Sequence, residues 1–169
     1  MPFYEWSESM SVGVPLLDDD NKCIIGIVNQ LHECLQNGSP TDVLNEIFDS
    51  LIAYFEFHFS REEKVIEACG YPHAKAHQEE HVVFTEHIYR LREGQLSGTG
   101  PAIDNELVDY LKNWLNHHIL ILDMGYQSYV LDHPVAEEVA WAFGSWFEEE
   151  GEDRHAVSTN LGAAIVNAL

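Results

Sequence analysis

A helical repeat of apolar residues returns four times along this chain and limits the folds it can adopt. In each segment the apolar side chains recur at steps of three and four, the spacing that places them on one face of an α-helix. We expect helices over 18–36, 40–69 and 74–92, and a fourth that carries Leu107 and ends near Leu131. The breaks are short, so consecutive helices should run antiparallel. The pattern predicts an all-α protein, an antiparallel up-down-up-down four-helix bundle.

The ends of the chain lie outside this repeat. Residues 1–17 are expected to form an irregular N-terminal arm, and 93–101 to form a loop. We assign 1–133 to the bundle and 134–169 to a partly helical C-terminal extension. A short fifth helix is predicted there from Val139, Phe143, Trp146 and Phe147. The extension either packs on the bundle, which we favour, or binds a protein partner or a second copy of the chain.

Composition argues against several classes of partner. The chain has 8 Lys and Arg against 29 Asp and Glu, a formal net charge of −21. Nucleic acids and anionic membrane surfaces recruit Lys and Arg, so neither is expected as a partner. No apolar stretch approaches the ~20 residues that span a bilayer, and the N-terminus lacks the pattern of a secretory signal. The three cysteines include no CxxC pair, which favours a reduced, cytoplasmic setting.

Polar residues interrupt the apolar stripes of three predicted helices. His58 and Glu62 lie four apart on the stripe of the second helix. His77 and His81 do the same on the third, and His118 lies on the stripe of the fourth. A buried ionisable group is costly unless it is paired or bound to a metal. One such residue is usually a core histidine with a partner, but four histidines and a glutamate on facing stripes indicate a metal site.

The depth of these residues along the bundle is an independent test of whether they form one site. Counting from each turn places three pairs level with one another: Asn21 with His58, Glu62 with His81, and His77 with His118. One layer therefore holds candidates from all four helices. Asp123 follows His118 by five residues, about 140° further round an ideal helix. It can reach the layer from the other side, or through a local π-type turn.

The candidate ligands are of mixed type. Imidazole and carboxylate groups together suit iron, manganese or zinc. Structural zinc usually takes four ligands, whereas six candidates at one level favour two metal ions bridged by carboxylates. The six candidates are His58, Glu62, His77, His81, His118 and Asp123.

These residues resemble those of the hemerythrin family, in its bacterial branch, over about Trp6 to Leu131. The resemblance rests on SVGVP at 11–15, HFSREE at 58–63, GYP with HQEEH at 70–81, and WLNHHILILDMGY at 114–126. It implies a non-haem di-iron site that binds dioxygen, or another small diatomic or anionic ligand, for storage, delivery or sensing. By the same resemblance, one iron is held by His77, His81 and His118 and the other by His58, with Glu62 and Asp123 as bridges.

One position departs from the family pattern. The family takes a further histidine ligand from the first helix, within a motif that Asp18 and Lys22 match, but the ligand position here holds Asn21. An amide oxygen binds hard cations only weakly. His117 and His73 are two less favoured stand-ins.

Several alternatives for the second iron stay open. Water or Asn21 could complete its coordination, the site could bind weakly and leave partial or mixed metal occupancy, or the arm or extension could supply a ligand. We favour a dioxygen-binding protein. The alternative is a di-iron peroxidase or oxidase, or a nitric-oxide-handling protein, that uses the extra open coordination. A third hypothesis is a bundle whose metal site has decayed, which the six matched ligand positions argue against.

Three further residues are assigned to the surroundings of the site. Trp114 and Phe84, each about one helical turn from a candidate ligand, are expected to form walls that exclude water. Tyr126, one turn after Asp123, is expected to hydrogen-bond a ligand carboxylate, because the groups around metal ligands commonly orient them in this way.

Overall fold

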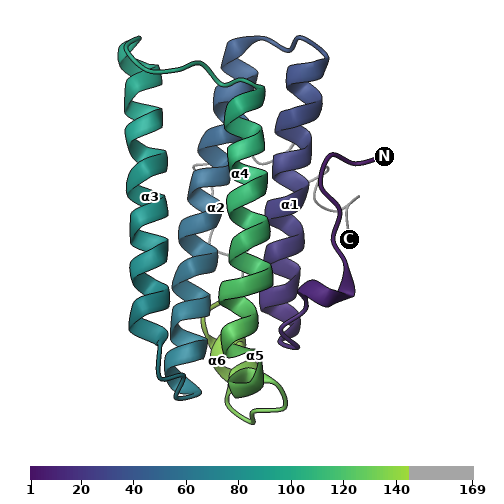
Figure 1. Ribbon diagram of the computed structural model, residues 1–169, viewed down its shortest axis with the longest axis vertical. Helices are drawn as coiled ribbons and strands as arrows, with labels where there is room; N and C mark the ends of the chain where they lie inside the picture. Colours follow the sequence, from purple (N-terminus) through teal and green to yellow (C-terminus); the bar gives the residue numbers. More distant parts are fainter. Residues whose placement is uncertain (145–169) are drawn as a thin grey trace.

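The computed structural model describes residues 1–144, and this part of the chain is helical without any β-strand (Figure 1). Its long antiparallel helices are α1 (Pro15–Gln36), α2 (Thr41–Ala68), α3 (Ala74–Ser97) and α4 (Asn105–His117). A π-helical segment, η2 (His118–Asp123), continues α4 into α5 (Met124–Val130). The arm contains a short 3₁₀ turn, η1 (Glu8–Met10), and α6 (Ala136–Ala142) follows the bundle. The predicted all-α four-helix bundle is therefore confirmed.

Two helix boundaries differ from the prediction. The first helix begins at Pro15 rather than Asp18, so the arm is shorter than expected. Proline suits the first turn of a helix because its φ is already helical and its missing N–H would have had no partner there. The third helix continues through the expected loop as far as Ser97 and ends at Gly98, whose φ of 70° is left-handed. The polar stretch 93–97 carries no apolar stripe, so periodicity alone could not extend the helix.

The core consists of two apolar clusters on either side of a polar layer. On α1, Leu17 belongs to one cluster and Cys23 to the other, and Val65 and Phe59 on α2 are divided in the same way. The side chains buried between these positions are polar and include Asp20, Asn21 and Glu62. The two clusters hold the four helices in register and so fix the depth of the polar layer.

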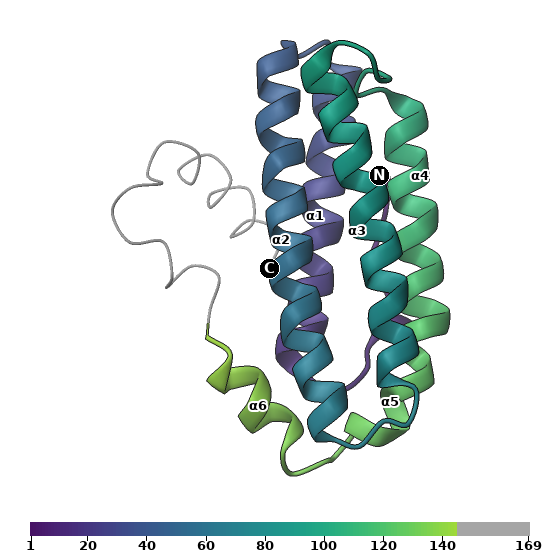
Figure 2. The ribbon, with the colours of Figure 1, turned by 90° about the vertical axis from the view of Figure 1, so that its left-hand side faces the viewer.

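The short helix α6 packs beside the lower halves of α1 and α2 (Figure 2). Ala136 and Ala140 are buried in the apolar cluster that contains Leu17 and Val65. Phe143, at the end of α6, makes an edge-on contact with Phe57 of α2, with ring centroids 5.2 Å apart. A fifth short helix was predicted here, but its remaining residues, Trp146 and Phe147, lie outside the described residues, as does any partner contact made by 145–169. The division of the chain at residue 133 stays a prediction.

Within residues 1–144, no helix has both the length and the apolar character that crossing a membrane requires.

Candidate metal centre

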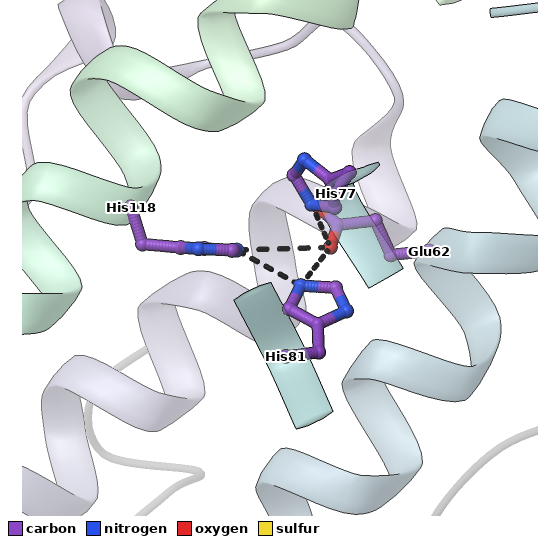
Figure 3. A group of neighbouring side chains, drawn as sticks. All are labelled: Glu62, His77, His81 and His118. Atoms are coloured by element: carbon purple, nitrogen blue, oxygen red, sulfur yellow. Dashed lines mark hydrogen bonds and ion pairs between the residues drawn. The ribbon is translucent and has the colours of Figure 1, made fainter. Parts of the chain in front are cut away.

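Four buried side chains converge between α2, α3 and the start of η2 (Figure 3). Oε2 of Glu62 lies 3.1 Å from Nε2 of His77 and 3.1 Å from Nε2 of His81. Nε2 of His118 lies 3.9 Å from the same oxygen. One ligand atom from each of these four residues falls within 4.8 Å of all the others. The structure thus brings together four of the six candidate ligands in one tight group.

The spacing of these atoms is that of ligands around one ion. Nε2 of His81 and Nε2 of His118 lie 3.1 Å apart, although two neutral ring nitrogens that both present lone pairs would repel each other. Two nitrogens held about 2.1 Å from a single metal at a right angle would be about 3.0 Å from each other. The two 3.1 Å contacts of Glu62 with imidazoles have the same length. The group therefore fits a common cation.

Electrostatics in this group follow from burial and proximity. Burial lowers the pKa of His118, but the carboxylates of Asp123 and Glu62 outweigh it and raise that pKa to about 10. Burial raises the pKa of Glu62, but contacts with His118, His77 and His81 hold it well below its usual value. Without a metal, a proton on His118 supplies positive charge beside these two carboxylates.

Asp123 joins the group through the π-helical segment. Its Oδ1 lies 3.1 Å from Nε2 of His118 and 3.6 Å from Nε2 of His77. An ideal α-helix would turn Asp123 about 140° away from His118. The wider turn of η2, which spans His118–Asp123, brings the two side chains back to one face. The π-type alternative from the sequence is the one that the structure adopts.

Aromatic side chains pack against the imidazoles of His118 and His81. Trp114 stacks on His118 with ring centroids 4.5 Å apart, and Phe84 stacks on Trp114 at 3.6 Å. Phe59 stacks on His81 at 3.8 Å. Trp114 and Phe84 lie beside the group as predicted, and their exclusion of water stays a prediction. The sequence reasoning did not find Phe59, although its place beside His58 was a signal.

Two polar residues orient ligands of this group from outside. The Tyr126 hydroxyl donates a short hydrogen bond to Oε1 of Glu62, which confirms its predicted contact with a candidate ligand carboxylate. Nδ1 of His81 lies 2.8 Å from Oε1 of Glu63. A carboxylate on Nδ1 keeps the proton there and leaves Nε2 free to bind a metal. The sequence analysis missed Glu63, because an acid beside a ligand gives no sign of its direction.

His58 lies outside the tight group and has different neighbours. Its Nδ1 lies 3.4 Å from Oδ2 of Asp20, and its buried Nε2 has no hydrogen-bond partner. Burial lowers the pKa of His58, but the hydrogen bond to Asp20 and the charges of Glu62 and Asp123 together raise it. Asp20, one residue before Asn21, was also missed by the sequence analysis.

Asn21 is fully buried, and neither its side-chain oxygen nor its nitrogen has a hydrogen-bond partner. The same holds for Nε2 of His58 and for Oδ2 of Asp123, whose other oxygen lies 3.1 Å from Nε2 of His118. Buried polar atoms without hydrogen bonds are rare in native proteins and call for an explanation. Most of these atoms are of the types that bind metals. The residues present therefore fit a second cation beside the tight group.

Asp18 of the first helix and the two histidines considered as stand-in ligands lie away from the tight group. Both oxygens of Asp18 bind the arm, accepting from the hydroxyl of Ser11 and from the backbone N–H of Val12. His117 and His73 are exposed, so neither enters the polar layer. Neither histidine therefore lies where a stand-in ligand was considered.

Comparison with known proteins agrees with this geometry. The family model described as the hemerythrin HHE cation binding domain matches residues 12–130. A bacteriohemerythrin of Stenotrophomonas maltophilia (strain R551-3) is 32% identical over 135 residues, which cover 79% of this chain and 85% of that protein. A myohemerythrin of Sipunculus nudus is 33% identical over 128 residues, which cover 73% and 91% respectively. The crystal structure of wild-type hemerythrin is similar with a TM-score of 0.72 at 25% identity, over 76% of this chain and 98% of that one.

Proposed function

This chain belongs to the hemerythrin family, and on that premise we propose that it is a non-haem di-iron protein that binds dioxygen. The observation that carries the proposal is the buried group of Glu62, His77, His81 and His118, whose ligand atoms have the spacing of donors around one ion. Storage, delivery and sensing share this chemistry. When bound, a pair of ferrous ions supplies the electrons that dioxygen binding requires.

The side chains divide into two halves in this proposal. His77, His81 and His118 would hold the first iron, and His58 would hold the second. Glu62 and Asp123 would serve both as carboxylate ligands. Trp114, Phe84 and Phe59 exclude water from the imidazoles, which strengthens electrostatic interactions inside the site.

We propose that Asn21 stands at the position of the missing histidine. Its buried amide, without hydrogen bonds, supports this assignment. With only His58 and a weak amide donor, a second iron would have more open coordination than in a standard carrier. Such open coordination favours the second candidate function, a peroxidase, oxidase or nitric-oxide-handling protein. It also allows partial or mixed metal occupancy.

Iron stoichiometry and absorption spectra of three proteins test these proposals: the native chain, Asn21→His and Asn21→Leu. We expect two irons per chain, with the second held less firmly in the native protein. Asn21→His should retain the second iron more strongly and autoxidise more slowly. Asn21→Leu is the matched control, because it keeps the size of the side chain and removes its donors, so it should not strengthen iron binding.

The outcomes separate the hypotheses. A native chain that takes up no iron would contradict the di-iron function and favour a decayed site. A stable, reversible spectrum on adding dioxygen to the reduced protein supports carriage or storage, whereas rapid oxidation or turnover of peroxide supports the enzyme. If native protein and Asn21→His hold two irons equally and autoxidise alike, Asn21 is not the weak point of the site.

A further inference from the structure

Arg61 is a buried cation on α2, one residue before Glu62, and only 3% of it is exposed. Its Nη1 donates to both oxygens of Asp20, at 2.8 and 2.7 Å. Its Nη2 donates a short hydrogen bond to the backbone carbonyl of Gly144, just beyond α6. A buried charge is tolerated only when it is paired and hydrogen-bonded, so these contacts fix the guanidinium in place.

Asp20 passes this constraint on to a candidate ligand. It is 4% exposed, and besides Arg61 it accepts a hydrogen bond of 3.0 Å from the hydroxyl of Tyr54. Its Oδ2 lies 3.4 Å from Nδ1 of His58. A carboxylate in that place keeps the imidazole proton on Nδ1, so that Nε2 carries the lone pair that binds metal.

The end of α6 forms the outer part of this arrangement. The guanidinium of Arg61 lies 4.6 Å from the ring centroid of Phe57 and 5.8 Å from that of Phe143. Gly144 has a φ of 93°, which only glycine adopts without strain, and its carbonyl accepts from Arg61. α6 therefore helps to position Arg61 against Asp20.

We propose that Arg61 and Asp20 are positioning residues for the second iron, and that the end of α6 sets their geometry. Gly144 and Phe143 hold the guanidinium on Asp20, and Asp20 holds His58 with Nε2 toward the metal. We expect the first iron to be affected less, because Nδ1 of its ligand His81 contacts Glu63 and not Asp20. This inference rests on the proposed di-iron function for its metal readout.

Anaerobic titration with Fe²⁺ tests the proposal on Arg61→Met. Losing the carboxylate that orients a metal-bound histidine lowers metal affinity by about 10–100-fold. Arg61→Met releases Asp20 from that place, so we expect the affinity for the second Fe²⁺ to fall by up to that amount, with the first unchanged. Gly144→Val strains the left-handed backbone and displaces the carbonyl, so it should weaken the second site in the same direction but less. The matched control is Lys64→Met, which removes a cation 4.7 Å from the Phe143 ring and should leave both affinities unchanged.

A second readout does not require iron. Nitrogen NMR of isotope-labelled, metal-free protein in alkaline buffer reports which ring nitrogen of His58 carries the proton. We expect Nδ1 in the native protein and a mixture of both tautomers in Arg61→Met. If Arg61→Met does not fold, Arg61→Lys replaces it. Lysine keeps the charge but offers one nitrogen in place of the two that contact Asp20 and Gly144 separately, so smaller changes in the same direction are expected.

Three results would overturn the inference. An unchanged second affinity in Arg61→Met contradicts the role of Arg61. A lower affinity with an unchanged His58 tautomer contradicts the route through Asp20. An unchanged affinity in Gly144→Val contradicts the part played by α6. If the native chain takes up no iron, the proposed function fails, and the tautomer alone decides whether Arg61 positions His58.

Discussion

The polar side chains that meet between α2, α3 and η2 are buried from water, and their hydrogen bonding inside the protein is incomplete. Glu62 and Asp123 are both fully buried, and Oδ2 of Asp123 accepts no hydrogen bond. The nearby imidazoles can neutralise these acids only by taking up protons. A cation would do so without protons and would also use the unpartnered atoms. Protons and metal ions therefore compete for the same side chains.

This competition predicts opposite pH dependence for the metal-free and iron-loaded proteins. The pKa of His118 is raised from 6.5 to about 10, so its contribution to metal-free stability is present below 6.5 and lost as pH rises toward 10. The pKa of Glu62 is lowered, so its contribution is present above 4.5 and lost as pH falls through its folded pKa. We therefore expect His118 and Glu62 together to stabilise the metal-free fold most between pH 4.5 and 6.5.

Iron binding should instead strengthen as pH rises, because it displaces the proton of His118. Thermal unfolding of both forms, measured from weakly acidic to alkaline pH, checks the prediction. The midpoint of the metal-free protein should fall toward alkaline pH while the stabilisation by iron grows. Equal pH profiles for the two forms would contradict it.

At the scale of elements, the π-helical segment η2 decides where Asp123 points. It accommodates five residues in about the turn that an α-helix makes with four. Ile121 lies inside it and is 60% exposed, so its side chain contributes little to the core. After deletion of Ile121, the aspartate would follow His118 by four residues, about 40° round an ideal helix.

Deletion of Ile121 is therefore expected to convert η2 to α-helix and to preserve iron stoichiometry. Insertion of one alanine after Ile121 is the matched control. It turns the aspartate about a further 100° and should lower iron content. Iron analysis with circular dichroism measures both. Loss of iron in the deletion with an intact helical spectrum would show that the π turn itself, and not the direction of the aspartate, is required.

Helix α3 depends on the site more than the other helices do. Of its 24 residues only His77, His81, Phe84 and Ile88 are buried, and two of these are candidate ligands. Removal of iron should therefore loosen α3 first. A ligand at 100 times its Kd adds about 2.7 kcal/mol of stability, so amide exchange around His77 should accelerate up to about a hundredfold.

Hydrogen exchange of the loaded and chelated proteins measures this effect. Amides near Val28 of α1, in the apolar cluster that contains Cys23 and Phe59, are the internal control and should change much less. Equal acceleration in α1 and α3 would mean that iron stabilises the whole bundle instead of α3.

The sequence predicts a side chain's place in the bundle only where residue spacing along a helix determines that place directly. Helical period and turn positions placed His58, Glu62 and Asn21 in one layer, because short connections leave little freedom in helix register. The five-residue step to Asp123 suggested a π turn as one of two solutions. Arg61 and Asp20 could not be predicted, because their directions depend on how α1, α2 and α6 pack. That packing is not encoded in any local period.

At the scale of the whole molecule, the formal charge of −21 opposes the compact state through self-repulsion. The same field attracts Fe²⁺ to the site. Salt screens both effects, with a Debye length that falls from about 30 Å at 0.01 M to about 8 Å at 0.15 M. Added salt should therefore act on stability and on iron uptake in opposite directions.

We expect the melting temperature of the metal-free protein to rise with ionic strength over this range, by about 2–4 °C for each kcal/mol of relieved repulsion. The rate of Fe²⁺ uptake should fall over the same range. The matched variant is Glu79→Gln with Glu80→Gln, because both acids are exposed on α3. It should melt higher than the native protein at low salt and respond less to added salt. A native melting temperature that falls with salt would mean that attractive ion pairs, such as that between Arg92 and Asp49, outweigh the net repulsion.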